Sequence, residues 1–251
     1  MTRVAVDAAE VDVAGRLLDG AHPRRIIAWA LGRFPRERVA VVTSLQADGM
    51  AVVDMAMQID PAVRIVTIDT GRLPEETYAY LDRVREHYAR GIEVRFPERE
   101  AVEEFTTTHG VNAFRDSVER RLHCCHLRKV EPLERLLGEL DCWITGLRRT
   151  QSARRGGTVA LELDPAHRGI VKVNPVAAWD EDAVRAHLAE NAVPLHPLYE
   201  RGYRSIGCAP CTRAVAQGED ARAGRWWWES GIDKECGIHG RPEALPQRRT
   251  A

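Results

Sequence analysis

Residues 38–50, RVAVVTSLQADGM, join a short apolar run to the start of a helical pattern. The run 38–43 is rich in β-branched residues and is typical of a buried strand in a parallel sheet. The loop 44–49 follows it, and we expect a helix from about Met50 to Gln58. Such a loop presents backbone N–H groups and the positive end of a helix dipole, which suits a phosphate. It matches neither a Walker loop nor G-x-G-x-x-G, so a routine strand-to-helix connection is the alternative.

The same alternation of apolar runs and helical patterns continues along the chain. We expect two amphipathic helices within 7–33, a long helix that opens at Pro74 and runs to about Arg90, and helical segments over about 98–137. Further short strands are predicted at 63–68, 92–96, 142–145, 159–163 and 170–173. The pattern predicts an α/β fold in which a parallel twisted sheet carries helices on both faces.

Length and composition limit the class of protein. The 251 residues are 44% hydrophobic and predict a single domain over 1–251, with an N-terminal helical segment at 1–35 and a flexible, loop-rich C-terminal segment at 200–251. The 36 basic and 37 acidic residues argue against a dedicated nucleic-acid binder. No apolar run approaches the roughly 20 residues of a membrane helix, and the N-terminus lacks a secretory pattern. We therefore expect a cytoplasmic protein with neither nucleic acid nor membrane as partner.

Six cysteines in a cytoplasmic chain call for metal binding or thiol chemistry, because disulfides are disfavoured there. Four of them form two pairs, Cys124, Cys125, Cys208 and Cys211. Adjacent cysteines rarely bridge each other, and four soft thiolates suit zinc or a [4Fe–4S] cluster. His123 and His126 favour zinc, and ordinary buried cysteines are the third interpretation.

The two remaining cysteines differ in context. Cys142 opens the apolar run CWIT and is expected to be a small core residue. Cys236 lies in ECGIHG near the C-terminus, where flanking glycines and a histidine three positions on are compatible with a nucleophile. An unimportant tail cysteine is the alternative for Cys236.

Three further segments are candidates for binding a nucleotide or an anion. The segment 146–157 follows the predicted strand 142–145 with four arginines, whose guanidinium groups match phosphate and sulfate oxygens. A solvated basic loop is the alternative. The turn 69–71, Asp-Thr-Gly, leaves its strand at the same sheet edge and could contact a ribose or base. In the third segment, Arg222 and Arg225 precede the three tryptophans at 226–228, which we expect to hold the C-terminal segment against the body.

Taken together, the motifs resemble the assimilatory adenylyl-sulfate (APS) reductases, the iron–sulfur branch of the APS and phosphoadenylyl-sulfate (PAPS) reductase family. The matching segments are TSLQADGM at 43–50, IDTGRLPEETY at 68–78, CCHLRKVEPL at 124–133, GLRRTQSARR at 146–155, RGYRSIGCAPCTRAV at 201–215, GRWWWE at 224–229 and KECGIHG at 234–240. The resemblance implies an adenine nucleotide α-hydrolase-like (PP-loop) fold and a [4Fe–4S] cluster on Cys124, Cys125, Cys208 and Cys211.

The resemblance also implies the reaction. Cys236 would attack the sulfur of APS and form an S-sulfocysteine, and thioredoxin or a glutaredoxin-like reductant would release sulfite for cysteine biosynthesis. The implied substrate-binding residues are Thr43, Ser44, Gln46, Asp69, Thr70, Gly71, Lys129, Gly146, Arg148, Gln151, Arg154, Arg222, Arg225 and His239. We also allow for a homo-oligomer.

Other functions are retained as alternatives. PAPS-restricted members typically lack the two cysteine pairs, which favours APS here, although some members with a cluster accept both nucleotides. An ATP-using enzyme of the same fold is disfavoured because its S-G-G-x-D-S loop is absent. A non-catalytic zinc or iron–sulfur redox sensor is the alternative from another class.

Overall fold

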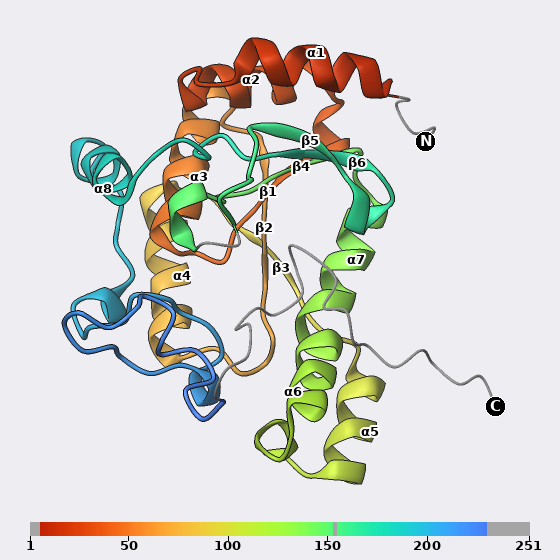
Figure 1. Cartoon of the computed structure of the whole chain (residues 1–251), viewed down its shortest axis with the longest axis vertical. Coiled ribbons are helices and arrows are strands. Elements are labelled where there is room, and N and C mark those ends of the chain that lie inside the picture. The colour runs from red at the N-terminus through yellow and green to blue at the C-terminus, as the bar shows by residue number, and fades with distance from the viewer. Residues whose placement is uncertain (1–5, 153–154, 230–251) are drawn as a thin grey trace. The chain divides into compact units, whose positions relative to one another are not determined.

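The computed structural model describes residues 6–152 and 155–229 (Figure 1). The chain divides into two compact units, each assembled from segments that are distant in the sequence. The first unit contains the described residues of 6–67, 75–94 and 136–197, and the second contains those of 68–74, 95–135 and 198–229. Among the described residues, no helix combines the length and apolar character that a membrane crossing requires.

The first unit is built on a six-stranded sheet in the order β3-β2-β1-β4-β6-β5. The strands are β1 (Val39–Val42), β2 (Arg64–Ile68), β3 (Glu93–Arg95), β4 (Cys142–Ile144), β5 (Leu161–Asp164) and β6 (Ile170–Val173). β1 runs parallel to both β2 and β4, and β4 runs parallel to β6. The predicted α/β fold with a mainly parallel sheet is confirmed.

The edge strand β5 departs from the parallel prediction, since it pairs with β6 in the antiparallel sense. Only residues 165–169 connect the two strands. A parallel crossover needs a dozen or more residues, so this short connection permits only the antiparallel arrangement. Arg168 and Gly169 complete the turn in left-handed backbone conformations, with φ of 60° and 68°.

Among the described residues, five α-helices lie wholly in the first unit: α1 (Ala8–Leu18), α2 (Pro23–Arg33), α3 (Ala47–Ile59), α4 (Glu75–His87) and α8 (Glu181–Glu190). α1 packs against β5, α2 against β6 and α3, and α3 against β1 and α8 (Figure 1). Local chemistry explains their starts. Asp7 and Asp180 cap α1 and α8 through their carboxylates, and Pro23 occupies the first position of α2, where its fixed φ suits a helix start.

The second unit contains α5 (Arg99–His109), α6 (Val118–Cys125) and the first residues of α7 (Glu131–Gly138). Between α6 and α7 the backbone forms one π-helical turn over His126–Val130. The core of this unit contains Phe105, Phe114, Leu127 and Trp226, together with the cysteines described below. Aromatic side chains from the segments 95–135 and 198–229 therefore both contribute to its apolar core.

Candidate functional site

The first unit places the loop 43–50 between β1 and α3. The Thr43 hydroxyl accepts a hydrogen bond from the backbone N–H of Leu45 at 3.0 Å, and the Ser44 hydroxyl accepts one from the Gln46 amide at 2.9 Å. Leu45 adopts a positive φ of 60°, which turns the chain toward the N-terminus of α3. The loop thus has the strand–turn–helix geometry in which a helix dipole favours a phosphate.

A second loop of the first unit, residues 146–152, contacts this one directly. The Arg148 guanidinium pairs with the Asp48 carboxylate, which also accepts a 2.7 Å hydrogen bond from the Gln151 amide. Gly146 makes the approach possible, because a Cβ there would lie only 2.6 Å from the backbone nitrogen of Gly49. The structure therefore brings together the predicted residues Gly146, Arg148 and Gln151 at the 43–50 loop.

Asp48 is the residue of this arrangement that the sequence did not single out. It occupies the first turn of α3, where an acid is ordinary for a helix start, and its partners lie 100 and 103 positions further on. Its carboxylate partly neutralises Arg148, so anion binding by that guanidinium would compete with the pair.

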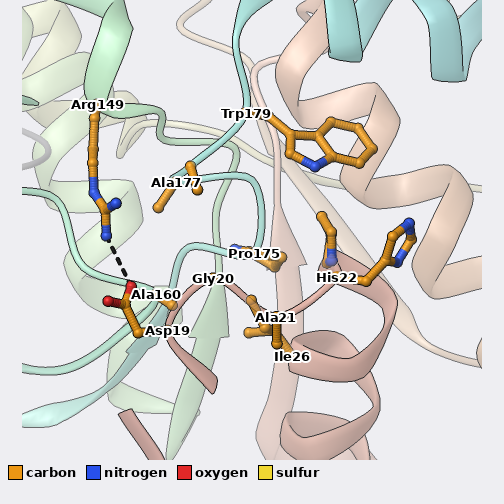
Figure 2. Close-up of a pocket in the computed structure, with 12 residues that line it drawn as sticks. Asp19, Gly20, Ala21, His22, Ile26, Arg149, Ala160, Pro175, Ala177 and Trp179 are labelled. Carbon is orange, nitrogen blue, oxygen red and sulfur yellow. Dashed lines mark hydrogen bonds and ion pairs between the residues drawn. The ribbon is translucent and has the colours of Figure 1, made fainter. Parts of the chain in front are cut away.

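The neighbouring arginine, Arg149, points to a different place. Its guanidinium donates to Asp19 at 3.1 Å and to the carbonyl oxygen of Thr158 at 2.7 Å. Figure 2 shows this pair on one side of a pocket, with His22 and Trp179 on the other. None of the predicted substrate-binding residues that the structure describes lines this pocket. The side chains of Arg148 and Arg149 therefore lie in different environments, one beside Asp48 and the other beside Asp19.

The second unit gathers all four paired cysteines. Cys124 and Cys211 are buried in its apolar core, and Cys125 and Cys208 pack against the same core. None of the four forms a disulfide with another described residue. Cys124 and Cys125 end α6, whereas Cys208 and Cys211 flank a short helical turn stabilised by a bond from the Cys211 N–H to the Cys208 carbonyl. Two pairs more than 80 residues apart in sequence therefore share one apolar environment.

The turn 69–72 connects the two cysteine pairs. The Thr70 hydroxyl lies 3.2 Å from the Cys208 sulfur, and the Thr70 carbonyl accepts a 2.8 Å bond from Arg128, which lies in the π-helical turn after Cys125. The carboxylate of Asp69 accepts the N–H of Gly71, whose φ is 69°. Asp69 and Thr70 are both buried. The predicted residues Asp69, Thr70 and Gly71 thus form one hydrogen-bonded turn against the cysteines.

Burial makes two of the paired thiols harder to deprotonate, and neighbouring arginines oppose this effect. Burial raises the pKa of the Cys124 thiol, and the Arg128 guanidinium opposes this shift. Burial also raises the pKa of Cys211 to about 12, again against a nearby guanidinium, that of Arg225. Thiols ligate metals as thiolates, so a bound cationic group and these arginines would both favour the ligating form. In the described part of the chain, no three or more His, Cys, Asp and Glu side chains form a group that could hold a metal ion.

Three other predicted substrate-binding residues lie in the second unit. Lys129 is half-buried in the π-helical turn. Arg225 is buried, with its guanidinium 4.6 Å above the Trp226 ring and one nitrogen 3.4 Å from the Ser205 hydroxyl. Arg222 is half-buried. Cys236, His239 and Arg154 lie outside the described residues.

Cys142 and the three consecutive tryptophans were predicted to be packing residues. Cys142 is fully buried in β4, as predicted. Of the three tryptophans, Trp226 is buried in the core of the second unit, Trp228 packs against that core, and Trp227 is 40% exposed. The expected packing of this segment is therefore confirmed for two of the three rings.

Comparisons with known proteins bear on these features. The model of the phosphoadenosine phosphosulfate reductase domain matches residues 38–214. Over 203 residues, 81% of each chain, the sequence is 49% identical to an adenosine 5'-phosphosulfate reductase of Burkholderia cepacia. A crystal structure of PAPS reductase from Candida auris, a phosphate complex, matches with a TM-score of 0.71 and 28% identity over 85% of this chain and all of that chain.

A more distant structure shares the fold. Yeast FAD synthetase in complex with FAD matches with a TM-score of 0.53 and 14% identity, over 96% of this chain and 83% of that one. This similarity supports the predicted PP-loop fold class.

Proposed function

The chain belongs to the phosphoadenosine phosphosulfate reductase family, and from its similarity to the adenosine 5'-phosphosulfate reductases within it we propose that it reduces APS to sulfite and AMP. It is accordingly an oxidoreductase of sulfate assimilation. The observation that carries the substrate assignment is the meeting of Cys124, Cys125, Cys208 and Cys211 in one apolar core, since the two pairs mark the APS branch of the resemblance.

The chemistry assigned to Cys236 balances with thiols alone. Its thiolate attacks the sulfur of APS, a sulfur–sulfur bond forms, and the bond from sulfur to the AMP phosphate oxygen breaks with its electron pair on AMP. A thiolate of thioredoxin, or of a glutaredoxin-like protein, then attacks Cys236, and sulfite leaves with the electron pair of the sulfur–sulfur bond. The second thiol of the reductant resolves the mixed disulfide, so its dithiol supplies both electrons.

Each unit contains residues that we assign to substrate binding, and they are described unit by unit. In the first unit, the 43–50 loop would hold the phosphate of the nucleotide, with hydroxyls from Thr43 and Ser44 and the charge of Arg148. In the second unit, Lys129, Arg222 and Arg225 are the assigned cations for the phosphosulfate, and the turn 69–71 is assigned to the nucleoside. Arg154 and His239 complete the proposal from outside the described residues. Cations of this kind stabilise the charge that develops on the departing AMP phosphate.

A [4Fe–4S] cluster fits the donor set. Such a cluster takes four cysteine thiolates, and the second unit has Cys124 and Cys211 in one apolar core with Cys125 and Cys208 packed against it. The four side chains do not form a metal-holding group as they stand in the structure, so ligation would require them to draw together. When bound, it would supply positive iron centres. These would organise this core and add to the positive electrostatic potential of the side chains assigned to bind the phosphosulfate. Cys124, Cys125, Cys208 and Cys211 would hold it.

PAPS is the second candidate substrate, because the matched family model and the Candida auris structure both carry that name. The ratio of kcat/KM for the two nucleotides separates the candidates. Clear preference for PAPS would overturn the substrate assignment. We expect the reaction to run in the cytoplasm and to supply sulfite for cysteine biosynthesis.

The decisive experiment mixes the purified protein with APS in the absence of any reductant. Mass spectrometry should find one sulfonate adduct, on the peptide that contains Cys236, and AMP should form in equal amount. Cys236→Ser should abolish the adduct, whereas Cys142→Ser, a substitution in the core of the first unit, should retain it. An adduct on another residue, or none in protein that produces sulfite, contradicts the mechanism.

A further inference from the structure

The pocket of Figure 2 lies within the first unit, and the proposed reaction uses none of the residues that line it. Its volume is about 280 Å³, just below the range of roughly 300–1,000 Å³ that is usual for drug-sized ligands. The floor is apolar, since Ile26, Ala160 and Ala177 line it and are each at most 5% exposed. The space therefore suits a small molecule with an apolar part.

Two aromatic rings form one wall of the pocket, and contacts outside the pocket hold each of them. The rings of His22 and Trp179 meet edge to face, with centroids 6.1 Å apart and an interplanar angle of 76°. The Nδ1 atom of His22 accepts the backbone N–H of Arg24 at 3.3 Å, and the Trp179 ring also lies 5.8 Å from that of His187. This wall is preformed, so binding of a ligand would require little ordering of the protein.

The opposite wall carries one charge of each sign. The Arg149 guanidinium donates to the Asp19 carboxylate at 3.1 Å, and Figure 2 shows both side chains across the pocket from the rings. Two further hydrogen bonds hold the arginine without Asp19. Its Nε donates to the Thr158 carbonyl at 2.7 Å, and its backbone N–H donates to the Ala177 carbonyl at 3.0 Å. The guanidinium therefore keeps its place when the ion pair opens.

This ion pair is open to exchange with a ligand. The side chain of Arg149 is 37% exposed and that of Asp19 is 63% exposed. Exposed pairs of this kind contribute little to stability, because water solvates both partners well. A ligand that brings its own charges can therefore replace the internal pair at small cost. By excluding water, the ligand also strengthens the contacts that it makes with the two side chains.

The charges of this wall select the charges of the ligand. An anion would match the guanidinium but bring a second negative charge close to Asp19, and a cation would match Asp19 but approach Arg149. A zwitterion satisfies both side chains, with its carboxylate against the planar guanidinium and its ammonium group against the aspartate. Because the paired atoms lie only 3.1 Å apart, the two charged groups of the ligand must also be close neighbours. An α-amino acid has this arrangement, with both groups on one carbon atom.

We propose that this pocket binds a free α-amino acid with an apolar side chain. The carboxylate of the ligand pairs with Arg149, its ammonium group pairs with Asp19, and its side chain occupies the apolar space toward Trp179. The inference is independent of the proposed function, since the pocket lining contains no described residue that we assign to substrate binding.

Ligand-observed NMR with the purified protein tests the charge requirement. We expect L-leucine to bind with a dissociation constant of about 1 mM or tighter. Three compounds related to leucine serve as comparisons: 4-methylpentanoate lacks the ammonium group, 3-methylbutylamine lacks the carboxylate, and 6-aminohexanoate, an isomer of leucine, carries its charges at opposite ends. Each should bind at least about fivefold more weakly than leucine. Equal binding of any of these compounds overturns the proposal, and so does the absence of binding by leucine, methionine and phenylalanine at about 10 mM.

Substitutions in the charged wall locate the ligand. Asp19→Asn removes the partner of the ammonium group, so the affinity for leucine should fall at least about fivefold, whereas the affinity for 4-methylpentanoate should stay the same or rise. Arg149→Met should weaken the binding of both compounds. Asp12→Asn, at an exposed position of α1 outside the pocket lining, is the matched control and should bind leucine as the wild type does.

A folding measurement separates lost binding from lost structure. Because Asp19 is exposed, Asp19→Asn should unfold in urea at the same midpoint as the wild type. Equal leucine affinity in Asp19→Asn and the wild type overturns the placement of the ligand in this pocket.

Discussion

The side-chain oxygen of Thr70 lies 3.2 Å from the sulfur of Cys208, although the two residues are 138 positions apart in the sequence. The Thr70 carbonyl is held by Arg128, close to the other cysteine pair. One residue of the Asp-Thr-Gly turn therefore contacts the surroundings of both pairs, and its hydroxyl has a polar role that a methyl group cannot fill.

If the proposed cluster binds at the four cysteines, replacing Thr70 by valine should weaken iron retention. Valine keeps the volume and removes the hydroxyl, and a net hydrogen bond contributes about 0.5–1.5 kcal/mol. We expect iron release to a chelator to accelerate about two- to tenfold by the same free energy. Thr107→Val, on the exposed face of α5, is the matched control and should behave as the wild type. Equal rates of iron release from Thr70→Val and the control would show that the Thr70 hydroxyl does not contribute to iron retention.

Gly207 makes room for a buried guanidinium. A Cβ at this position would lie 2.3 Å from a terminal nitrogen of Arg225 and 2.5 Å from its Cζ. Gly207→Ala should therefore push the guanidinium away from the Trp226 ring and lower the free energy of unfolding by about 1–3 kcal/mol, as overpacking usually does. Urea unfolding followed by tryptophan fluorescence measures the change.

A double-mutant cycle identifies the cause of that loss. In an Arg225→Ala background the guanidinium is absent, so Gly207→Ala should cost less than about 0.5 kcal/mol. The same cost in both backgrounds would show that the alanine disturbs some other contact.

Parts of this structure follow directly from local sequence. The apolar runs around 39–42, 64–68 and 142–144 became strands because their residues are buried between other layers, and Pro74 preceded a helix as its fixed φ allows. The pairing of Cys124-Cys125 with Cys208 and Cys211 was predicted from ligand chemistry and a family resemblance. The structure buries Cys124 and Cys211 in one core and packs Cys125 and Cys208 against it.

Other parts depend on contacts that local patterns do not encode. The π-helical turn at 126–130 has the same apolar spacing as an α-helix, so the sequence predicted only a helix there. Arg121 sits in the run RR at 120–121 on an amphipathic helix, where exposure is the usual outcome. Its burial follows from Glu229, 108 residues away, and the burial of Arg148 similarly follows from Asp48.

Gly146→Ala should disturb the first unit more than any exposed glycine. Its Cβ would meet backbone atoms of Asp48 and Gly49 at 2.6–2.8 Å, and backbone cannot yield as a flexible side chain does. We expect a loss of about 1–3 kcal/mol in the free energy of unfolding and at least tenfold weaker AMP binding by calorimetry. Gly157→Ala, whose Cβ would meet no atom within 4 Å, is the control and should stay within about 0.5 kcal/mol. Similar effects of the two substitutions would argue against a close approach of the loops.

His196 is a buried histidine of the first unit whose protonation opposes folding. Its Nε2 lies 3.0 Å from the Thr77 hydroxyl, and its ring centre lies 5.0 Å from that of Tyr80. Burial lowers the pKa of His196 from 6.5 to about 4, although the carboxylate of Glu76 acts in the opposite direction. Between these two pKa values the unfolded chain binds a proton that the folded chain does not.

The free energy of unfolding should therefore fall as the pH is lowered from about 6.5 to about 4. The contribution of a neutral His196 is fully present above about pH 6.5, falls as the pH is lowered toward about 4, and is absent below that value. We expect His196→Asn, which keeps a polar group for Thr77 but does not titrate there, to reduce the loss of unfolding free energy between pH 6.5 and 4 by about 1–3 kcal/mol relative to the wild type. Urea unfolding at several pH values measures both slopes. Because His123 and the carboxylates titrate equally in both proteins, parallel slopes would mean that His196 is protonated in the folded chain as readily as in the unfolded one.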